Sequence, residues 1–385
     1  MFFYRHPKTV YADYAAATPL SENARLAMEP YLSKHFGNPS SIHSFGREAK
    51  KAINDTRASI ARLLQVQPDE ILFTSGGTES NNLAIFGVQK PAKGRTHFIT
   101  TPIEHGSVLE PIHALESAGT TVTYLPVDSK GRVNKEKLET AILPETRLVS
   151  IAYANGEIGT VEKIRALGKV VRDRQSVQPI YFHTDASQAA SYLRILPNDM
   201  NVDLLTIDSS KIYGPKGVGL LYVRRGTPLS PIFRGGLQER GSRAGTENVA
   251  AIVGFGEALL SAAASREHEA KRLAILRDEL KKELLQKIPG AFVNGEGEIL
   301  PHFLNICIPG ADAEFLGVKL DTFGIAVSSA SACRSISGKG SSYVIEALPG
   351  RIGCGASSLR ISLGRNTTRR DILAIVDALI KLALQ

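Results

Sequence analysis

The feature that most constrains this chain is an alternation of short β-branched runs with stretches of helical spacing, between about residues 20 and 255. The runs are ILFTS (71–75), THFIT (96–100), TVTYLPV (121–127), RLVSIAYA (147–154), IYFHTDA (180–186), LLTID (204–208) and GVGLLYV (217–223). Helical spacing is clearest at 48–64 and 107–117. Strands separated by helices predict βαβ units with right-handed crossovers, and hence an α/β fold with a mainly parallel sheet covered on both faces.

A different pattern begins near residue 250, where a long helical stretch runs until it meets the stop signal Pro289-Gly290. FLNICI, GIAVSS and a terminal helical segment follow, which is typical of a smaller α+β domain. We therefore expect a large α/β domain over residues 15–255. Residues 1–14 and 256–385 are expected to form the smaller domain.

The composition, with 43% hydrophobic and 22% charged residues among 385, is typical of a soluble globular protein. The segment MFFYRHPKTV has only three apolar residues before Arg5 and makes a poor signal peptide. The tail ILAIVDALIKLALQ is interrupted by Asp377 and Lys381, and no other stretch suggests a membrane span. These patterns predict a soluble, cytoplasmic protein without a membrane contact.

The three cysteines cannot form an even disulfide set, and none belongs to a CxxC pair. We therefore expect neither a disulfide scaffold nor a zinc ribbon, and no metal site. Cys307 lies in an apolar strand and is predicted to be in the core. Cys354, between Gly353 and Gly355, is interpreted as a bystander thiol.

A glycine turn in DEILFTSGGTESNN joins a predicted strand to a predicted helix. Backbone N–H groups at a helix start bind anions without a cation, so Gly77 and Thr78 are candidates to hold a phosphate. No GK[ST] follows, so this is not a Walker loop. Taken alone, such a strand–Gly-Gly–helix motif is more often only a turn.

Further polar residues follow other predicted strands: His105 in TTPIEHGSV, Asp185 and Gln188 in HTDASQ, and Lys211 in DSSKIYGPKG. Strand carboxyl ends gather at one edge of a parallel sheet, where ligands of open α/β folds bind. An aspartate there can hold a pyridine nitrogen positive, and a buried lysine can form a Schiff base with an aldehyde. Each residue alone has an ordinary explanation, as a helix cap or a solvated side chain. Their combination indicates a pyridoxal-phosphate site.

The chain also resembles a known family over nearly its full length. The motifs that carry the resemblance are YADYAAATP, FGNPSSIHSFGREAK, FTSGGTESNN, TPIEHGSV, NGEIGT, HTDASQAA, SSKIYGPKGVG, GGLQERGSRAGTENV, SSASAC and SSLRISLGR. In this order they resemble the cysteine desulfurases, of the class V aminotransferase group of fold-type I pyridoxal-phosphate enzymes. The resemblance implies pyridoxal 5′-phosphate as the cofactor and L-cysteine as the substrate.

For the cofactor ring, the resemblance implies that Lys211 forms the Schiff base and later moves the Cα proton. His105 would stack on the ring, and Asp185 would contact the pyridine nitrogen. Gln188 and Asn155 would lie near the phenolic oxygen. These five residues are the ring-binding candidates.

For the phosphate, the resemblance implies contacts from Gly77 and Thr78, joined by Thr246 of a second subunit. Family members commonly have a Ser and a His shortly before the lysine, where this chain has Asp208 and Ser210. An ionised aspartate beside a phosphate is repulsive, so Asp208 is expected to point elsewhere or to be neutralised. Ser209 or Ser210 would then donate to the phosphate. A second departure, Gly156 in place of the usual Asn, is expected to matter little.

For the substrate, the resemblance implies that Arg360 binds the carboxylate with both arms of its guanidinium. Asn38 and Asn155 are expected near the substrate. Cys333 in SSASAC matches the family's nucleophile, which takes the sulfur as a persulfide. Small residues surround it, from Ser328 to Ala332 and in SISGKGSS, which predicts a mobile segment. Receipt of that sulfur by Cys354 is an alternative to its bystander role.

The family implies a homodimer and sulfur-acceptor proteins, either an iron–sulfur scaffold or a tRNA-thiolation enzyme, with no direct nucleic-acid contact. The net charge of +8 suits an acidic acceptor but is also compatible with a plain solvated surface. Three other functions stay open: a selenocysteine lyase, another transaminase-like or decarboxylating enzyme of the fold, or a cofactor-free scaffold that binds RNA or protein. The set Lys211, Asp185 and Arg360 argues against the last.

Overall fold

The computed structural model describes residues 9–88, 96–174, 179–329, 341–351 and 353–383. Its large sheet has the strand order β2-β8-β7-β6-β5-β3-β4. These strands are β4 (Thr121–Tyr124), β3 (His97–Thr100), β5 (Thr146–Ser150), β6 (Tyr181–Asp185), β7 (Leu204–Asp208), β8 (Gly219–Val223) and β2 (Ile71–Thr74). The pairs from β4 through β7 are parallel, and β8 is antiparallel to both its neighbours. The predicted mainly parallel α/β sheet is confirmed, strand for strand.

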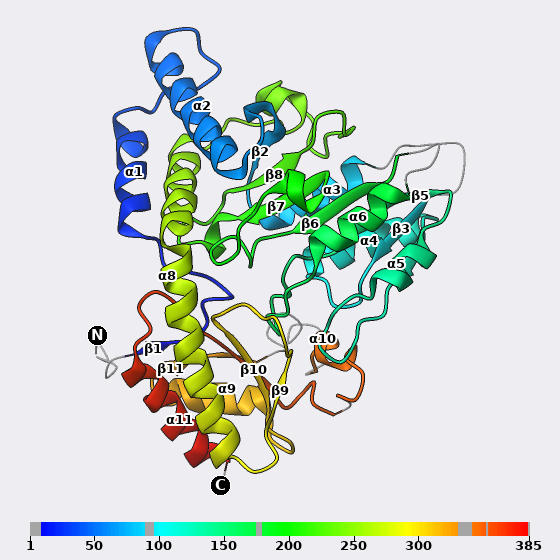
Figure 1. The fold of residues 1–385 in the computed structure, drawn as a ribbon. Helices are drawn as coiled ribbons and strands as arrows, with labels where there is room; N and C mark the ends of the chain where they lie inside the picture. Colours follow the sequence, from blue (N-terminus) through cyan, green and yellow to red (C-terminus); the bar gives the residue numbers. More distant parts are fainter. Residues whose placement is uncertain (1–8, 89–95, 175–178, 330–340, 352, 384–385) are drawn as a thin grey trace.

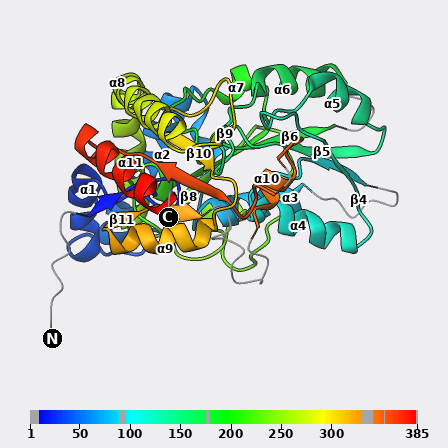
Figure 2. The same ribbon diagram turned by 90° about the horizontal axis from the view of Figure 1, so that it is seen from below.

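Helices cover both faces of this sheet (Figure 2). One face carries α3 (Gly77–Gly87) and α4 (Gly106–Ser117), and the other carries α5 (Lys135–Ala141) and α6 (Ile164–Asp173). Neighbouring residues of a strand serve opposite faces, because side chains alternate along a strand. Tyr181 and Leu204 belong to the core under α3 and α4, whereas Phe182 and Leu205 belong to the core on the other side.

The rest of the chain builds a four-stranded antiparallel sheet in the order β12-β13-β10-β9. Its strands are β12 (Ser328–Ser329), β13 (Ser358–Ser362), β10 (Phe303–Cys307) and β9 (Phe292–Asn294). A separate parallel pair joins β1 (Val10–Tyr11) to β11 (Ile325–Ala326). The helices of this part are α9 (Ala313–Thr322), α10 (Tyr343–Glu346) and α11 (Arg369–Ala383). The N-terminal strand is thus tied to the C-terminal part of the chain.

Helix α8 (Val249–Lys287) has 39 residues and runs past both parts of the molecule (Figure 1). It packs against α1 (Glu22–Ser33), α2 (Ser44–Leu64) and α11. One window of α8 has a mean hydropathy of 1.3, enough for a membrane span, but 56% of that window is buried in the protein. The prediction that no stretch suggests a span is therefore wrong for α8, whose apolar character serves the core. The predicted domain boundary at 255 and 256 falls inside this uninterrupted helix, so that division stays a prediction.

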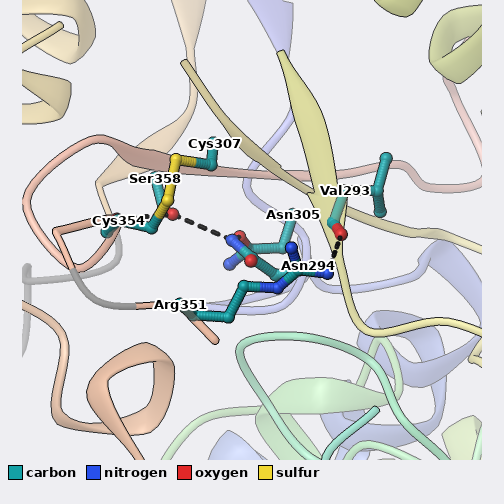
Figure 3. The surroundings of a disulfide bond; sticks show 7 residues. All are labelled: Val293, Asn294, Asn305, Cys307, Arg351, Cys354 and Ser358. Atoms are coloured by element: carbon teal, nitrogen blue, oxygen red, sulfur yellow. Dashed lines mark hydrogen bonds between the residues drawn. A yellow bond between two sulfur atoms is a disulfide. The ribbon is translucent and has the colours of Figure 1, made fainter. Parts of the chain in front are cut away.

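Cys307 and Cys354 form a disulfide bond, with their Cα atoms 5.8 Å apart (Figure 3). The register of β10 and β13 places Cys307 opposite Ser358, and the Ser358 hydroxyl donates to the carbonyl of Cys354 at 2.7 Å. The interpretation of Cys354 as a bystander thiol is therefore wrong, because an odd count of cysteines excludes complete pairing but not a single bond. Cys307 is buried, as predicted. While the bond holds, Cys354 has no thiol with which to receive sulfur.

Candidate active site

The ends of four strands carry the predicted cofactor residues. β2 leads into the glycine turn before α3, and β3 leads to His105 at the start of α4. β6 ends at Asp185, and β7 ends at Asp208, just before the short helical turn Ser209–Lys211. Carboxyl ends of parallel strands form a ligand-binding edge, so the fold brings these segments together as expected.

Asn81 of α3 connects the candidates for the ring nitrogen and the ring face. Its Nδ2 donates to Asp185 Oδ2 at 2.8 Å and to Ser107 Oγ at 2.8 Å. Ser107 in turn meets His105, with 2.7 Å between Ser107 Oγ and His105 Nδ1. Asn81 is fully buried, so this chain of contacts holds Asp185 and His105 in a fixed relation. Sequence reasoning missed Asn81, although it lies in the quoted motif FTSGGTESNN.

His105 caps α4, and the backbone N–H of Ser107 donates to its Nδ1 at 3.1 Å. This contact leaves the proton of a neutral ring on Nε2. Desolvation by the surrounding protein is the largest influence on His105 and lowers its pKa, while the charge of Asp185 acts in the opposite direction. A neutral imidazole with an exposed face is suited to stack on an aromatic ring.

Lys211 reaches from the end of β7 to the N-terminal segment, where its Nζ donates to the carbonyl of Ala16. Burial lowers the pKa of Lys211 below the ordinary value, although the carboxylate of Asp208 opposes this shift. A lysine that loses its proton easily is a better nucleophile toward an aldehyde. Gln188 is anchored in the same region, because its Nε2 donates to the carbonyl of Ala15 at 2.9 Å.

Arg360 of β13 lies between two oxygen atoms of the protein. Its Nη1 donates to the Gly156 carbonyl at 2.9 Å, and its Nη2 pairs with Asp13 Oδ1 at 2.8 Å. Its buried Nε has no hydrogen-bond partner among the described residues. The guanidinium is therefore held in place but keeps donors for a further anion. Asp13, from the motif YADYAAATP, was not predicted as a site residue.

Asn155 is buried, and its side-chain amide forms hydrogen bonds with backbone groups. Its Nδ2 donates to the Ile103 carbonyl at 2.8 Å, and its Oδ1 accepts from Glu157 and Ile158 N–H groups at 2.8 and 3.0 Å. Gly156 follows directly, and a Cβ placed there would lie 3.5 Å from Gln188 Nε2. Asn155 thus shapes the wall next to Gln188, with one amide hydrogen left for a ligand.

The glycine turn before α3 is built as an anion site. Gly76 has a φ of +147°, which glycine adopts readily, and Gly77 begins the helix. The Gly77 N–H, however, already donates to Asp208 Oδ2 at 3.0 Å, while Ser210 N–H donates to Asp208 Oδ1 at 2.7 Å. Of the two alternatives expected for Asp208, that it points elsewhere is therefore wrong, and that it is neutralised stays a prediction. The helix start attracts any anion, and it holds the nearest carboxylate.

Two buried hydroxyls near this turn have no hydrogen-bond partner among the described residues, those of Ser209 and Ser187. The Ser209 hydroxyl lies beside Gly214, 2.1 Å from the position of an added Cβ, and phosphate binding by Ser209 or Ser210 stays a prediction. Ser187 has a buried hydroxyl without a hydrogen-bond partner among the described residues, 3.4 Å from a Cβ placed on Gly77. That orphaned donor and the helix start suit a phosphate group, although the Asp208 carboxylate already accepts from the Gly77 N–H.

Three predicted residues lie at the margins of this group. Thr78 is exposed in the first turn of α3. Thr246 is exposed and lines a cavity of about 210 Å³ with Thr74 and Ser75 of its own chain. Asn38 lies on the exposed loop between α1 and α2, where its Oδ1 accepts from Ser40 N–H at 2.9 Å. Cys333 lies outside the described residues.

Glu104 is a further acid that the sequence analysis did not single out. It is buried beside His105, and its oxygens accept from Thr101 Oγ1 at 2.8 Å and from the Ala152 N–H at 3.0 Å. Burial raises the pKa of Glu104 to about 8, and the negative charge of Asp185 adds to the shift. Near neutral pH this carboxyl group is therefore mostly protonated and does not compete with Asp185 for a cation.

The fold and this edge of the sheet define a class of protein. The family model "Aminotransferase class-V" matches residues 10–375, and the chain belongs to that family of pyridoxal-phosphate enzymes. The chain is 44% identical over 375 residues to "Cysteine desulfurase IscS" of Dictyoglomus turgidum, covering 97% of this chain and 94% of that protein.

Solved structures give the same result. A "NIFS-LIKE PROTEIN" aligns with a TM-score of 0.90 at 34% identity, over 97% of this chain and 99% of that one. The structure "SspA in complex with cysteine" aligns with a TM-score of 0.79 at 36% identity, over 92% of this chain and 99% of that one. The resemblance read from the motifs is confirmed. Cysteine desulfurases use L-cysteine as their substrate.

Proposed function

We propose that this chain is a cysteine desulfurase, which converts L-cysteine to L-alanine and transfers the sulfur to Cys333. The observation that carries the proposal is the convergence of a lysine of lowered pKa, an aspartate at a strand end and an arginine with spare donors. The similarity to proteins named cysteine desulfurase over almost the whole chain supports it. Sulfur delivery for iron–sulfur cluster assembly or tRNA thiolation is the use that this family suggests.

Pyridoxal 5′-phosphate, when bound, supplies an aldehyde and a ring that accepts the electrons released from an amino acid. Asp185 is the residue for the ring nitrogen, because Asn81 and the Ser187 N–H fix both its oxygens. His105 is the residue for the ring face. Gln188 and Asn155 border the position expected for the phenolic oxygen.

Lys211 takes two roles, which follow from its lowered pKa and its place at the end of β7. Its amine would hold the aldehyde group of the cofactor, and once the amino group of the substrate has replaced it there, the freed amine would carry the Cα proton. Arg360 holds the substrate carboxylate through donors that Asp13 and Gly156 leave free. Fixing the carboxylate orients the Cα–H bond toward the base.

Sulfur transfer needs a nucleophile that attacks the substrate's sulfur. The Cys333 thiolate attacks that sulfur, the carbon–sulfur bond breaks, and the carbon skeleton takes the protons needed to leave as L-alanine. In total, L-cysteine and the Cys333 thiol give L-alanine and a Cys333 persulfide. No oxidant or reductant is consumed.

The proposal is tested by incubating the holoenzyme with L-cysteine and measuring its intact mass and the alanine formed. We expect one added sulfur atom, located on Cys333 by peptide mapping, and no addition in Cys333→Ala. Cys307 and Cys354 are the internal controls, because their disulfide leaves no thiol to modify. Full desulfuration of L-cysteine by Cys333→Ala would contradict the assignment of the nucleophile.

We further propose that the enzyme is a cytoplasmic homodimer. Several large apolar side chains are exposed, among them Phe36 and Ile42 near Asn38, and Leu237 near Thr246. Such exposure in one chain is typical of a surface that another copy covers. Thr246 would then complete the partner's phosphate site, and Asn38 is expected near the substrate. Sedimentation equilibrium that gives only the monomer mass for the active enzyme would contradict this arrangement.

A further inference from the structure

The carboxylate of Asp208 lies where this chain should hold the phosphate of its cofactor. Oδ2 accepts from the N–H of Gly77, the first residue of α3, at 3.0 Å. A Cβ placed on Gly77 would lie 3.1 Å from the same oxygen. Asp208 therefore fills the space that the two glycines of the turn leave bare.

A second observation marks the same place as an anion site. The Ser187 hydroxyl is buried, lacks a partner among the described residues, and lies 3.4 Å from the position of a Cβ on Gly77. A buried hydroxyl without a partner is costly, so it is expected to donate to a ligand. The helix start and this hydroxyl together can bind a phosphate oxygen.

The neighbouring cations form no ion pair with Asp208 among the described residues, although the charge of Lys211 is close enough to interact with it. Arg243 pairs with Glu79 in the first turn of α3, at 2.9 Å, and Lys211 Nζ donates to a backbone carbonyl. A phosphate placed here therefore meets a carboxylate that competes for the same N–H and repels it. None of these described contacts pairs a cation with the Asp208 carboxylate, so its repulsion of a phosphate is not removed.

We infer that Asp208 is an internal competitor for the phosphate group of the cofactor, so that this chain binds pyridoxal 5′-phosphate weakly for its family. The inference rests on the cofactor-binding role proposed above and deepens it. On binding, the carboxylate leaves the Gly77 N–H, and Ser187 donates to the incoming phosphate. The cofactor thus exchanges more readily than it would with a neutral residue at position 208.

The test is a spectroscopic titration of the cofactor-free, full-length protein with pyridoxal 5′-phosphate and, in parallel, with pyridoxal. Asp208→Asn keeps the shape and removes the charge. We expect it to tighten binding of pyridoxal 5′-phosphate by at least about tenfold, with pyridoxal changed by less than about twofold. Ser187→Ala is the opposite variant, and we expect it to weaken binding of the phosphate-bearing ligand alone.

Pyridoxal separates competition from an effect through Lys211, whose pKa the charge of Asp208 also influences. If Asp208→Asn changes the affinity for both ligands equally, or leaves the affinity for pyridoxal 5′-phosphate unchanged, the inference is overturned. Asp208→Ser carries the same expectation and replaces the asparagine variant if that variant does not fold. If pyridoxal 5′-phosphate does not bind to Lys211 of the wild-type protein at all, both the inference and the proposed function are overturned.

Discussion

Arg360 and Gly77 are two groups of this active site that suit an anion, and each already meets a carboxylate of the protein. Asp13 lies 2.8 Å from Arg360 Nη2, and Asp208 lies 3.0 Å from the Gly77 nitrogen. A guanidinium carries a full positive charge and five donors, whereas Gly77 offers one N–H and the partial charge of a helix end. Arg360 can therefore bind a protein carboxylate and a ligand anion at the same time, whereas Gly77 must release the protein carboxylate before it binds a ligand anion.

The largest effect is expected where that guanidinium is removed. Arg360→Lys keeps a positive charge but loses the planar pair of donors, so we expect kcat/KM for L-cysteine to fall about 100-fold. Alanine formation under limiting substrate measures it. The control is the affinity for pyridoxal 5′-phosphate, which should stay within about twofold because the phosphate is bound elsewhere. A kcat/KM close to that of the wild type would show that another residue binds the carboxylate.

Glu104 provides the contrast of a buried carboxyl group that meets no cation among its described contacts. Its pKa of about 8 means that the folded protein binds this proton more tightly than the unfolded chain does. The resulting stability is complete below the pKa of the unfolded carboxyl and is lost as the pH rises through about 8. As the pH rises from 6 to 8, we expect ionisation of Glu104 to lower the free energy of unfolding by about 2 kcal/mol.

Urea unfolding of the wild type and of Glu104→Gln at both ends of that range measures this effect. The variant cannot ionise at this position, so its loss of stability with rising pH should be smaller by that amount. Glu116→Gln is a matched control, because Glu116 lies in exposed surroundings where its oxygen accepts from Tyr124. Parallel pH profiles for the wild type and Glu104→Gln would show that Glu104 is ionised in the folded protein.

The large sheet could be predicted from the sequence because each strand has a local signature, a run of β-branched residues bounded by turn residues. The strand ends at Asp185 and Asp208 followed from the same pattern. The family resemblance added Arg360, which composition and spacing could not have placed in a site. Prediction worked where neighbours along the chain decide the structure.

What the sequence did not predict depends on residues that meet only in three dimensions. Asp13 and Arg360 are 347 positions apart, and Gly77 and Asp208 are 131 apart. The direction of the Asp208 side chain required knowing that the start of α3 faces the end of β7. The Cys307–Cys354 bond likewise depends on the register of β10 with β13. Repulsion from a phosphate suggested that the Asp208 side chain turns away from the glycine turn. Without the cofactor, attraction to the start of α3 determines its direction instead.

The smallest expected effect gives the sharpest test of the two anion sites. Asp13→Asn removes the carboxylate from Arg360 but keeps an oxygen that can accept from Nη2. Since a partly exposed ion pair contributes little, we expect KM for L-cysteine to fall by no more than about threefold. The matching change at the other site, Asp208→Asn, is expected to tighten phosphate binding by at least about tenfold. A tenfold fall in KM for Asp13→Asn would mean that a built-in carboxylate competes with the ligand even at a guanidinium, and the difference between the sites would then lie in geometry rather than in charge.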